Sequence, residues 1–330
     1  MEETITERLH FISSGKQHKI STFAEDVSRG LSALPKYLNP QYFYDREGSL
    51  LFEEISEQPE YYPTRTELSI LEKNAEEISR LFSPETVLVE LGSGSARKTR
   101  TLIEAFIRRF GRLHFIPVEI SPSILRQSSE ILLNDYQELS ITAVAAEFET
   151  GLQAISTQLK RPKLIVWLGS SIGNFDQQHA ANFLRQLSQL MNPRDRLLIG
   201  MDLVKDVKIL EAAYNDAADV TAAFNLNLLK RINRELGGHF DLQKFTHCAF
   251  FNREKERIEM HLVSERPQLV AIDALKMDIH FKGGESIHTE NSHKYRQETI
   301  GSLADKANLK LEKQWIDEKN WFCVNLFSAN

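Results

Sequence analysis

Short apolar runs alternate with helical segments between about residue 86 and residue 204, and this alternation restricts the fold more than any other feature. The predicted strands are TVLVEL, LHFIPVEI (113–120), ITAVAAEF (141–148), KLIVWLGS (163–170) and RLLIGMDLV (196–204). Strands of this kind, separated by helices, are typical of a parallel sheet that is covered on both faces. Because crossovers are right-handed, we predict a doubly wound α/β sheet.

The pattern changes after Asp206. A helical segment from about residue 207 to residue 236 precedes strand-like runs that read as hairpins, and a helix and two strands close the chain. We therefore predict that the α/β domain consists of residues 66–203 and 294–330. Residues 204–293 are predicted to be an insertion that joins residues 1–65 in an α+β substrate domain.

Composition and charge exclude several classes of protein. The net charge of −6 argues against a protein that binds nucleic acid through phosphates. No apolar run approaches the roughly 20 residues of a membrane helix, so no membrane association is expected. The first residues lack the apolar core of a signal peptide, and two cysteines cannot form a disulfide framework. We expect a cytoplasmic protein, and the polar surface favours a monomer.

A glycine turn follows the first predicted strand and opens a helix, in the sequence Glu90-Leu91-Gly92-Ser93-Gly94. A dinucleotide-binding fingerprint reads G-x-G-x-x-G, but Arg97 stands at its third glycine position, which disfavours a nicotinamide dehydrogenase. The acidic residue before the turn suits a ligand that carries a cation or an amine, such as S-adenosylmethionine. The alternative is a helix-entry turn that binds no ligand.

Acidic side chains also stand at the ends of the next two predicted strands. Glu119 lies where related folds place a ribose-binding carboxylate, which can accept both ribose hydroxyls. Glu147 and Phe148 would offer an acceptor and an aromatic wall to an adenine. One such carboxylate is usually a solvated surface residue, but three at successive strand ends indicate a ligand site.

The fourth strand continues into the polar turn GSSIGNF, which contains Asn174. The Asn174 amide could bind a carboxylate or an amine, or it could be the N-cap of the next helix. Tyrosines between residues 42 and 62 offer apolar walls with hydroxyl groups, although most would serve the core. His288 and His293 lie in different predicted elements, and adjacent His247 and Cys248 rarely bind one ion, so no metal site is predicted.

Several long segments resemble a known family. YFYDREGSLLFEEISEQPEYYPTRTE, VELGSGSARKTR, LGSSIGNF, MDLVKD, YNDAADVTAAFNLNLLKRINREL, ERIEMHL and TENSHKY together are similar to the histidine-specific methyltransferases of ergothioneine biosynthesis. The resemblance covers the chain from about Ser32 to its end. It implies a class I S-adenosylmethionine-dependent methyltransferase fold, Rossmann-like, with an inserted substrate domain. It also implies trimethylation of the α-amine of L-histidine to hercynine, the first step of ergothioneine biosynthesis.

The resemblance assigns roles to individual residues. Gly92 and Lys98 would belong to the cofactor loop, and Glu119 and Glu147 stand where the family often has aspartate. The implied ligands of histidine are Asn174 and Tyr214 for its carboxylate, Tyr61, Glu290 and Ser292 for its imidazole, Met260 beside them, and Tyr44 near its amine through water. Tyr44 and Asn174 would be the catalytic pair. Without the resemblance, Glu290 and Ser292 would read as a polar loop that closes a hairpin.

Other functions are compatible with parts of this pattern. An N-methyltransferase of another amino acid or of a thiohistidine would keep the cofactor residues and change Glu290, Ser292 or Met260. A non-catalytic protein that binds S-adenosylmethionine would be expected to lose Asn174 or Tyr214. All five of these residues are present, and we expect L-histidine as substrate, S-adenosylmethionine as methyl donor and no metal.

Overall fold

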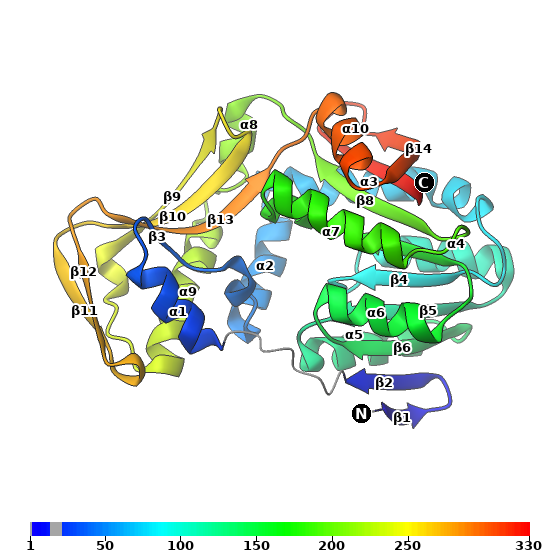
Figure 1. The fold of residues 1–330 in the computed structure, drawn as a ribbon, viewed down its shortest axis with the longest axis horizontal. Coiled ribbons are helices and arrows are strands. Elements are labelled where there is room, and N and C mark those ends of the chain that lie inside the picture. Colours follow the sequence, from blue (N-terminus) through cyan, green and yellow to red (C-terminus); the bar gives the residue numbers. More distant parts are fainter. Residues whose placement is uncertain (1, 14–21) are drawn as a thin grey trace. The chain divides into compact units, whose positions relative to one another are not determined.

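The computed structural model describes residues 2–13 and 22–330, which divide into two compact units (Figure 1). The sheet unit comprises residues 2–13, 66–203 and 295–330. The inserted unit comprises residues 22–65 and 204–294. In the described residues, no helix is long and apolar enough to cross a bilayer.

A nine-stranded sheet forms the centre of the sheet unit, in the order β1-β2-β6-β5-β4-β7-β8-β15-β14. Its strands are β1 (Glu2–Thr6), β2 (Leu9–Ser13), β4 (Val87–Leu91), β5 (Leu113–Glu119), β6 (Leu139–Ala145), β7 (Lys163–Trp167), β8 (Arg196–Asp202), β14 (Leu309–Ile316) and β15 (Phe322–Ala329). The six strands β2, β6, β5, β4, β7 and β8 pair in parallel with one another. The chain order reverses between β4 and β7, so the predicted doubly wound sheet is confirmed.

The end of the chain closes this sheet with an antiparallel hairpin, as predicted. Strand β15 pairs antiparallel with β8, from Phe322 opposite Asp202 to Phe327 opposite Leu197. Strand β14 then pairs antiparallel with β15 and forms the outer edge.

Helices cover both faces of the sheet because the parallel strands are apolar on both sides. Val87, Val89 and Leu91 of β4 pack in one core with residues of α6, α7 and α10. Leu88 faces the other core, together with residues of α3, α4 and α5. The helices are α3 (Tyr62–Arg80), α4 (Thr99–Phe110), α5 (Pro122–Asp135), α6 (Phe148–Gln158), α7 (Gln177–Leu190) and α10 (Gln297–Lys306). Figure 1 shows α6 and α7 on the same side of the sheet.

The first strands correct the expected assignment of all residues 1–65 to the substrate domain. Strand β2 pairs in parallel with β6, from Leu9 opposite Ile141 to Ser13 opposite Ala145. The side chains of Leu9 and Phe11 are buried in the core that also contains Ile141. The hairpin of β1 and β2 therefore extends the sheet beyond β6, and the pairing supplies partners to backbone groups of an exposed edge.

The inserted unit combines a four-stranded sheet with helices. The sheet has the order β3-β13-β10-β9, and β11 pairs with β12 in a separate hairpin. The strands are β3 (Lys36–Tyr37), β9 (Phe245–Asn252), β10 (Arg257–Ser264), β11 (Gln268–Ile272), β12 (Met277–Phe281) and β13 (Ser286–His293). The helices are α1 (Phe23–Ser32), α2 (Arg46–Glu57), α8 (Val207–Ala212) and α9 (Val220–Leu236). Helix α9 contacts α2, β9 and β10, so it holds the unit together.

Candidate functional site

The carboxyl ends of four parallel strands bring the predicted cofactor residues to one edge of the sheet unit. Gly92 follows β4, Glu119 ends β5, Glu147 follows β6, and Gly169 lies just beyond β7. Parallel strands end on the same side, and ligands of doubly wound sheets bind where the strand order reverses. Here that point lies between β4 and β7.

Gly92 has a backbone conformation that favours glycine. Its φ angle is +69°, and its N–H donates to the Val118 carbonyl at 2.8 Å. A Cβ atom at this position would lie 3.3 Å from the Phe148 ring. The absence of a side chain therefore lets Phe148, the first residue of α6, approach the turn.

Glu119 links the glycine turn to the start of the next helix. Its Oε2 accepts a hydrogen bond from the Gly94 N–H at 3.2 Å, and its Oε1 accepts one from the Ser121 N–H at 3.1 Å. Each carboxylate oxygen can accept a further hydrogen bond. The side chain is thus held in place with capacity for a ligand hydroxyl. Glu147 occupies the N-cap position of α6, but its side chain makes no capping hydrogen bond.

Glu90 lies in β4, two residues before Gly92, and its carboxyl group is buried. Its Oε1 accepts a hydrogen bond from the Thr99 hydroxyl, whereas Oε2 has no hydrogen-bond partner among the described residues. Burial raises the pKa of Glu90 to about 8; the Thr99 hydroxyl and the Lys98 ammonium oppose this rise. A buried carboxylate oxygen without a partner is costly and would be stabilised by a nearby cation.

We expect Glu90→Gln to stabilise the ligand-free protein more at pH 8 than at pH 5. The pKa of Glu90 rises in the folded chain from 4.5 to about 8, so the stability that protonated Glu90 contributes is lost as the pH rises through this window. Glutamine stays neutral, and the gain at pH 8 should be ~1–3 kcal/mol. Thermal unfolding at both pH values measures it.

The matched control for this prediction is Glu77→Gln. Hydrogen bonds from Lys313 and Trp315 lower the pKa of Glu77 in the folded protein. Its contribution is therefore already complete at pH 5, and the control should change the melting temperature equally at both pH values. Equal shifts at both pH values for Glu90→Gln as well would contradict the raised pKa of Glu90.

Glu67 is a residue of this edge that the sequence reading missed. Its side chain is fully buried, and its two oxygens accept hydrogen bonds from the Gly169 N–H at 2.9 and 3.0 Å. It also forms an ion pair with Lys98, whose Nζ lies 3.3 Å from the position of a Cβ on Gly169. Glu67 therefore holds the turn after β7 against Lys98 of the cofactor loop. The one sign of this role in the sequence is that Glu67, an acidic residue, stands within the apolar pattern of a helix.

Asn174 ends the short 3-10 helix Ser171–Asn174, and it is not a helix cap. The N-cap of α7 is Asp176, whose side chain accepts a hydrogen bond from the His179 N–H at 2.8 Å. The alternative reading of Asn174 as a cap is therefore wrong. Its amide stays a candidate for ligand binding.

In the inserted unit, strand pairing brings several predicted substrate residues to one face of the four-stranded sheet. Glu290 of β13 lies opposite Met260 of β10, and Ser292 lies opposite Ile258. Met260 is almost fully buried. Burial raises the pKa of the Glu290 carboxyl to about 7, and the Lys294 ammonium lowers it in part.

Three polar groups meet beside these residues. The Tyr214 hydroxyl donates to Ser292 Oγ at 2.8 Å. Lys294 Nζ donates to Ser292 Oγ at 2.8 Å and to the Tyr214 hydroxyl at 3.1 Å. Lys294 itself is buried, and the sequence reading did not select it although it lies within the TENSHKY segment. The Tyr61 ring lies 6.3 Å from that of Tyr214.

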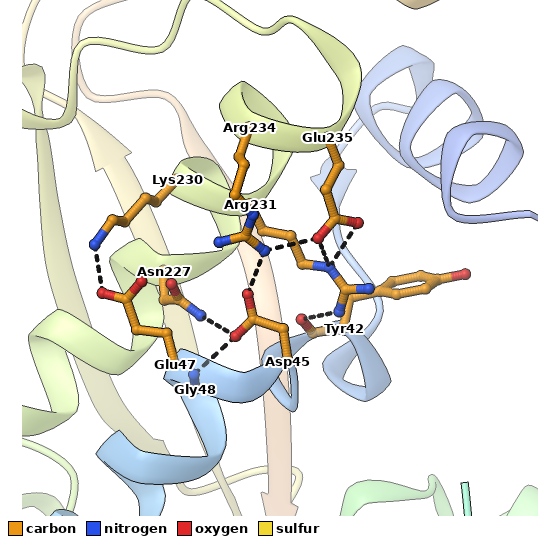
Figure 2. Close-up of polar contacts among 9 residues, drawn as sticks. All are labelled: Tyr42, Asp45, Glu47, Gly48, Asn227, Lys230, Arg231, Arg234 and Glu235. Carbon is orange, nitrogen blue, oxygen red and sulfur yellow. Dashed lines mark hydrogen bonds and ion pairs between the residues drawn. The ribbon is translucent and has the colours of Figure 1, made fainter. Parts of the chain in front are cut away.

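Residues on either side of Tyr44 in the chain, Tyr42 and Asp45, are both held by side chains of α9 (Figure 2). The Arg231 guanidinium donates to the Tyr42 carbonyl at 2.9 Å. Asp45 accepts hydrogen bonds from Asn227 at 2.8 Å and from Arg234 at 2.6 Å. Although burial alone would raise the pKa of Asp45, hydrogen bonds from Arg234, Gly48 and Asn227 lower it, so this anchor is a carboxylate.

The Tyr44 side chain is half exposed, at 39%. Its ring lies 5.6 Å from that of Phe52 and 5.8 Å from that of Phe224, both in edge contacts. These edge contacts fix the position of the Tyr44 ring within an aromatic cluster.

The family described as "Histidine-specific methyltransferase, SAM-dependent" matches residues 23–329. The chain belongs to this family. Its fold is accordingly the class I methyltransferase fold that the resemblance implied.

Three proteins that are similar to this chain have different names. Histidine N-alpha-methyltransferase of Mycolicibacterium smegmatis is 43% identical over 301 residues, which cover 91% of this chain and 93% of that protein. Ergothioneine biosynthesis protein 1 of Schizosaccharomyces pombe is 29% identical and covers 82% of this chain, but the match covers 36% of that longer protein. L-tryptophan methyltransferase trpM of Psilocybe serbica is 30% identical, with 82% of this chain and 81% of that protein covered.

One group of potential metal ligands in this methyltransferase was not foreseen. Glu259, His261 and His288 place ligand atoms within 4.8 Å of one another, because His261 lies opposite His288 in the pairing of β10 with β13. Metal bonds of roughly 2.1 Å would require ligand atoms within about 4.2 Å of one another. Arg257 already forms an ion pair with Glu259 at 2.7 Å, so a cation would compete with its guanidinium. That the enzyme requires no metal stays a prediction.

Proposed function

We propose that this chain transfers three methyl groups from S-adenosylmethionine to the α-amine of L-histidine, which yields hercynine, the first intermediate of ergothioneine biosynthesis. The observation that carries the proposal is the match over 91% of the chain to a protein named histidine N-alpha-methyltransferase. Two features of the structure support it. Acidic side chains stand at the ends of the parallel strands of the sheet unit, and Glu290 and Ser292 form a polar pair on β13.

The residues at the edge of the sheet unit fit S-adenosylmethionine. The unpartnered oxygen of Glu90 would face a positively charged ligand, and Gly92 leaves room against the turn. Glu119 would accept the ribose hydroxyls, while Glu147 and Phe148 would contact the adenine. Lys98, held by Glu67, would keep the cofactor loop in place.

The polar pair on β13 fits an imidazole. Glu290 would accept the ring N–H, Ser292 would bind the other nitrogen, and Met260 and Tyr61 would contact the ring. Asn174 would donate to the carboxylate of histidine, and Tyr44 would act on the amine through water. The resemblance also assigns Tyr214 to the carboxylate, but in the structure its one hydroxyl proton is donated to Ser292, so we propose that Tyr214 acts on the imidazole through Ser292.

The proposed chemistry asks for positioning more than for a strong base. When bound, S-adenosylmethionine supplies a methyl group on a sulfonium, which is already a reactive donor. The protein would hold the deprotonated amine in line with this methyl group and exclude water. Asn174 and Tyr44 would orient the amine, and the small residues Gly169 and Ser171 would leave space for successive methyl groups. No covalent enzyme intermediate is needed.

The test is incubation of the purified protein with S-adenosylmethionine and each of the twenty amino acids, followed by mass spectrometry. We expect histidine alone to gain methyl groups, up to three, and we expect the same rate after treatment with EDTA. Methylation of a different amino acid, or binding of S-adenosylhomocysteine without any turnover, would replace the proposal with one of the alternatives. Activity that EDTA abolishes and a divalent ion restores would show a metal requirement.

A further inference from the structure

We propose that Lys294 is a positioning residue that makes Ser292 a hydrogen-bond donor and Glu290 an acceptor toward the substrate, so that β13 recognises a neutral imidazole in one tautomer. This inference rests on the proposed function, since it concerns how the same pocket selects histidine. It assigns a role to a buried lysine for which the reaction itself has no use.

The direction of each hydrogen bond follows from the groups that make it. An ammonium can only donate, so Ser292 Oγ and the Tyr214 hydroxyl oxygen both accept from Lys294, at 2.8 and 3.1 Å. The Tyr214 hydroxyl, the more acidic of the two, donates to Ser292 Oγ at 2.8 Å. Both lone pairs of Ser292 Oγ are thereby occupied. The proton of Ser292 must then be donated to a third group.

Glu290 provides the complementary half of the pair. Glu290 and Ser292 lie opposite Met260 and Ile258, two alternate positions of β10 that share one face. Among the described residues, no side-chain hydrogen bond to the Glu290 carboxylate is found, and Lys294 is the charge that opposes the effect of burial on its ionisation. Lys294 thus favours the ionised carboxylate, which can only accept.

Ser292 as a hydrogen-bond donor and Glu290 as an acceptor together match one protonation form of an imidazole ring. A neutral imidazole has one N–H and one unprotonated nitrogen, whereas an imidazolium has two N–H groups and a phenyl ring has neither. Without Lys294, the Ser292 hydroxyl could rotate and accept, and Glu290 would keep its proton to higher pH. The pocket would then lose its preference for this form of the ring.

Lys294 is anchored well enough to serve this role. Its backbone N–H donates to the Glu256 carbonyl at 2.8 Å, and its Nζ lies 4.9 Å from the centre of the Tyr214 ring. The side chain is buried, at 4% exposure, so its donors are directed to groups of the protein and not to bulk water.

The experiment compares Lys294→Met with Lys36→Met in steady-state kinetics from pH 6 to pH 9. Lys36 is a matched control because it is a buried lysine of the same sheet that pairs with Glu285 and not with Tyr214 or Ser292. In Lys294→Met we expect KM for histidine to rise about tenfold or more, from the loss of charge-assisted hydrogen bonds. The KM for S-adenosylmethionine should stay unchanged.

The pH profile separates this role from a structural one. Removal of the Lys294 charge should raise the pKa of Glu290 above its present value of about 7, so the acid limb of kcat/KM for histidine should move to higher pH. The ionisations of free histidine are the same in every variant and cancel in the comparison. Lys294→Arg keeps the charge, and its acid limb should stay close to that of the wild type even if its KM rises.

Each outcome decides a specific point. If wild-type protein does not methylate histidine, the proposed function fails, and the inference fails with it. If the wild type is active but Lys294→Met matches Lys36→Met in both KM and pH profile, only the role of Lys294 is overturned. Should Lys294→Met not fold, Lys294→Gln keeps a donor without the charge, and an unshifted acid limb in that variant would equally reject the role.

Discussion

Gly92→Val is expected to abolish binding of S-adenosylmethionine and of its product S-adenosylhomocysteine. A Cβ at this position would lie 3.3 Å from the Phe148 ring, and the φ angle of +69° is one that a β-branched residue rarely adopts. The turn would have to move, and Phe148 and the space proposed for the cofactor would move with it. Calorimetric titration with S-adenosylhomocysteine should show no heat of binding.

Gly111→Val provides the control for backbone strain. Gly111 has a φ angle of +73°, at the C-cap of α4, and a Cβ there meets no atom within 4 Å. Both substitutions should cost on the order of 1–3 kcal/mol of stability from the strained conformation. Only Gly92→Val should lose the cofactor. A folded Gly92→Val protein with unchanged affinity would show that the turn is a helix entry without a ligand.

Local patterns were enough to predict the sheet unit. Apolar strands and amphipathic helices alternate there, and each parallel strand delivers its end to the same edge, so the positions of Gly92, Glu119 and Glu147 followed from the order of elements. The hairpin of β1 and β2 was missed. Its pairing with β6 joins residues about 130 positions apart, and nothing in a short window distinguishes it from an isolated hairpin.

The polar partners of the site were harder to predict, because they depend on pairing between distant segments. Glu67 reaches Gly169 across 102 positions of sequence, and Lys294 reaches Tyr214 across 80. His261 and His288 likewise became neighbours only through the register of β10 against β13. A charged residue in an apolar pattern is a sign that such a partner exists, but the identity of the partner comes from the tertiary fold.

The family resemblance contributed most at Glu290, because the local sequence alone predicts only a polar loop that closes a hairpin there. The structure places it in β13 opposite buried Met260 of β10, and desolvation raises its pKa to about 7. A carboxylate in such a position is costly without a ligand that donates to it. The histidine imidazole is the donor that we propose.

Glu290→Ala should therefore weaken the use of histidine far more than the binding of S-adenosylmethionine. Loss of a charge-assisted hydrogen bond to this carboxylate should cost about 1.5–3 kcal/mol, or on the order of 10–150-fold in kcat/KM for histidine. The pocket also becomes larger and less polar, so phenylalanine and tryptophan should compete better, because their rings no longer leave a buried carboxylate unpaired. Methyl transfer to the amine should survive, since Tyr44, Asn174 and Tyr214 are unchanged. The measurement is kcat/KM for histidine, phenylalanine and tryptophan.

Glu290→Gln, which retains an acceptor oxygen, should lie between the wild type and the alanine variant. Glu259→Ala, on the paired strand but on the other face of the sheet, should keep the wild-type preference. If Glu290→Ala retains an undiminished preference for histidine, Glu290 does not bind the imidazole, and the selection of substrate must lie with other residues of the pocket.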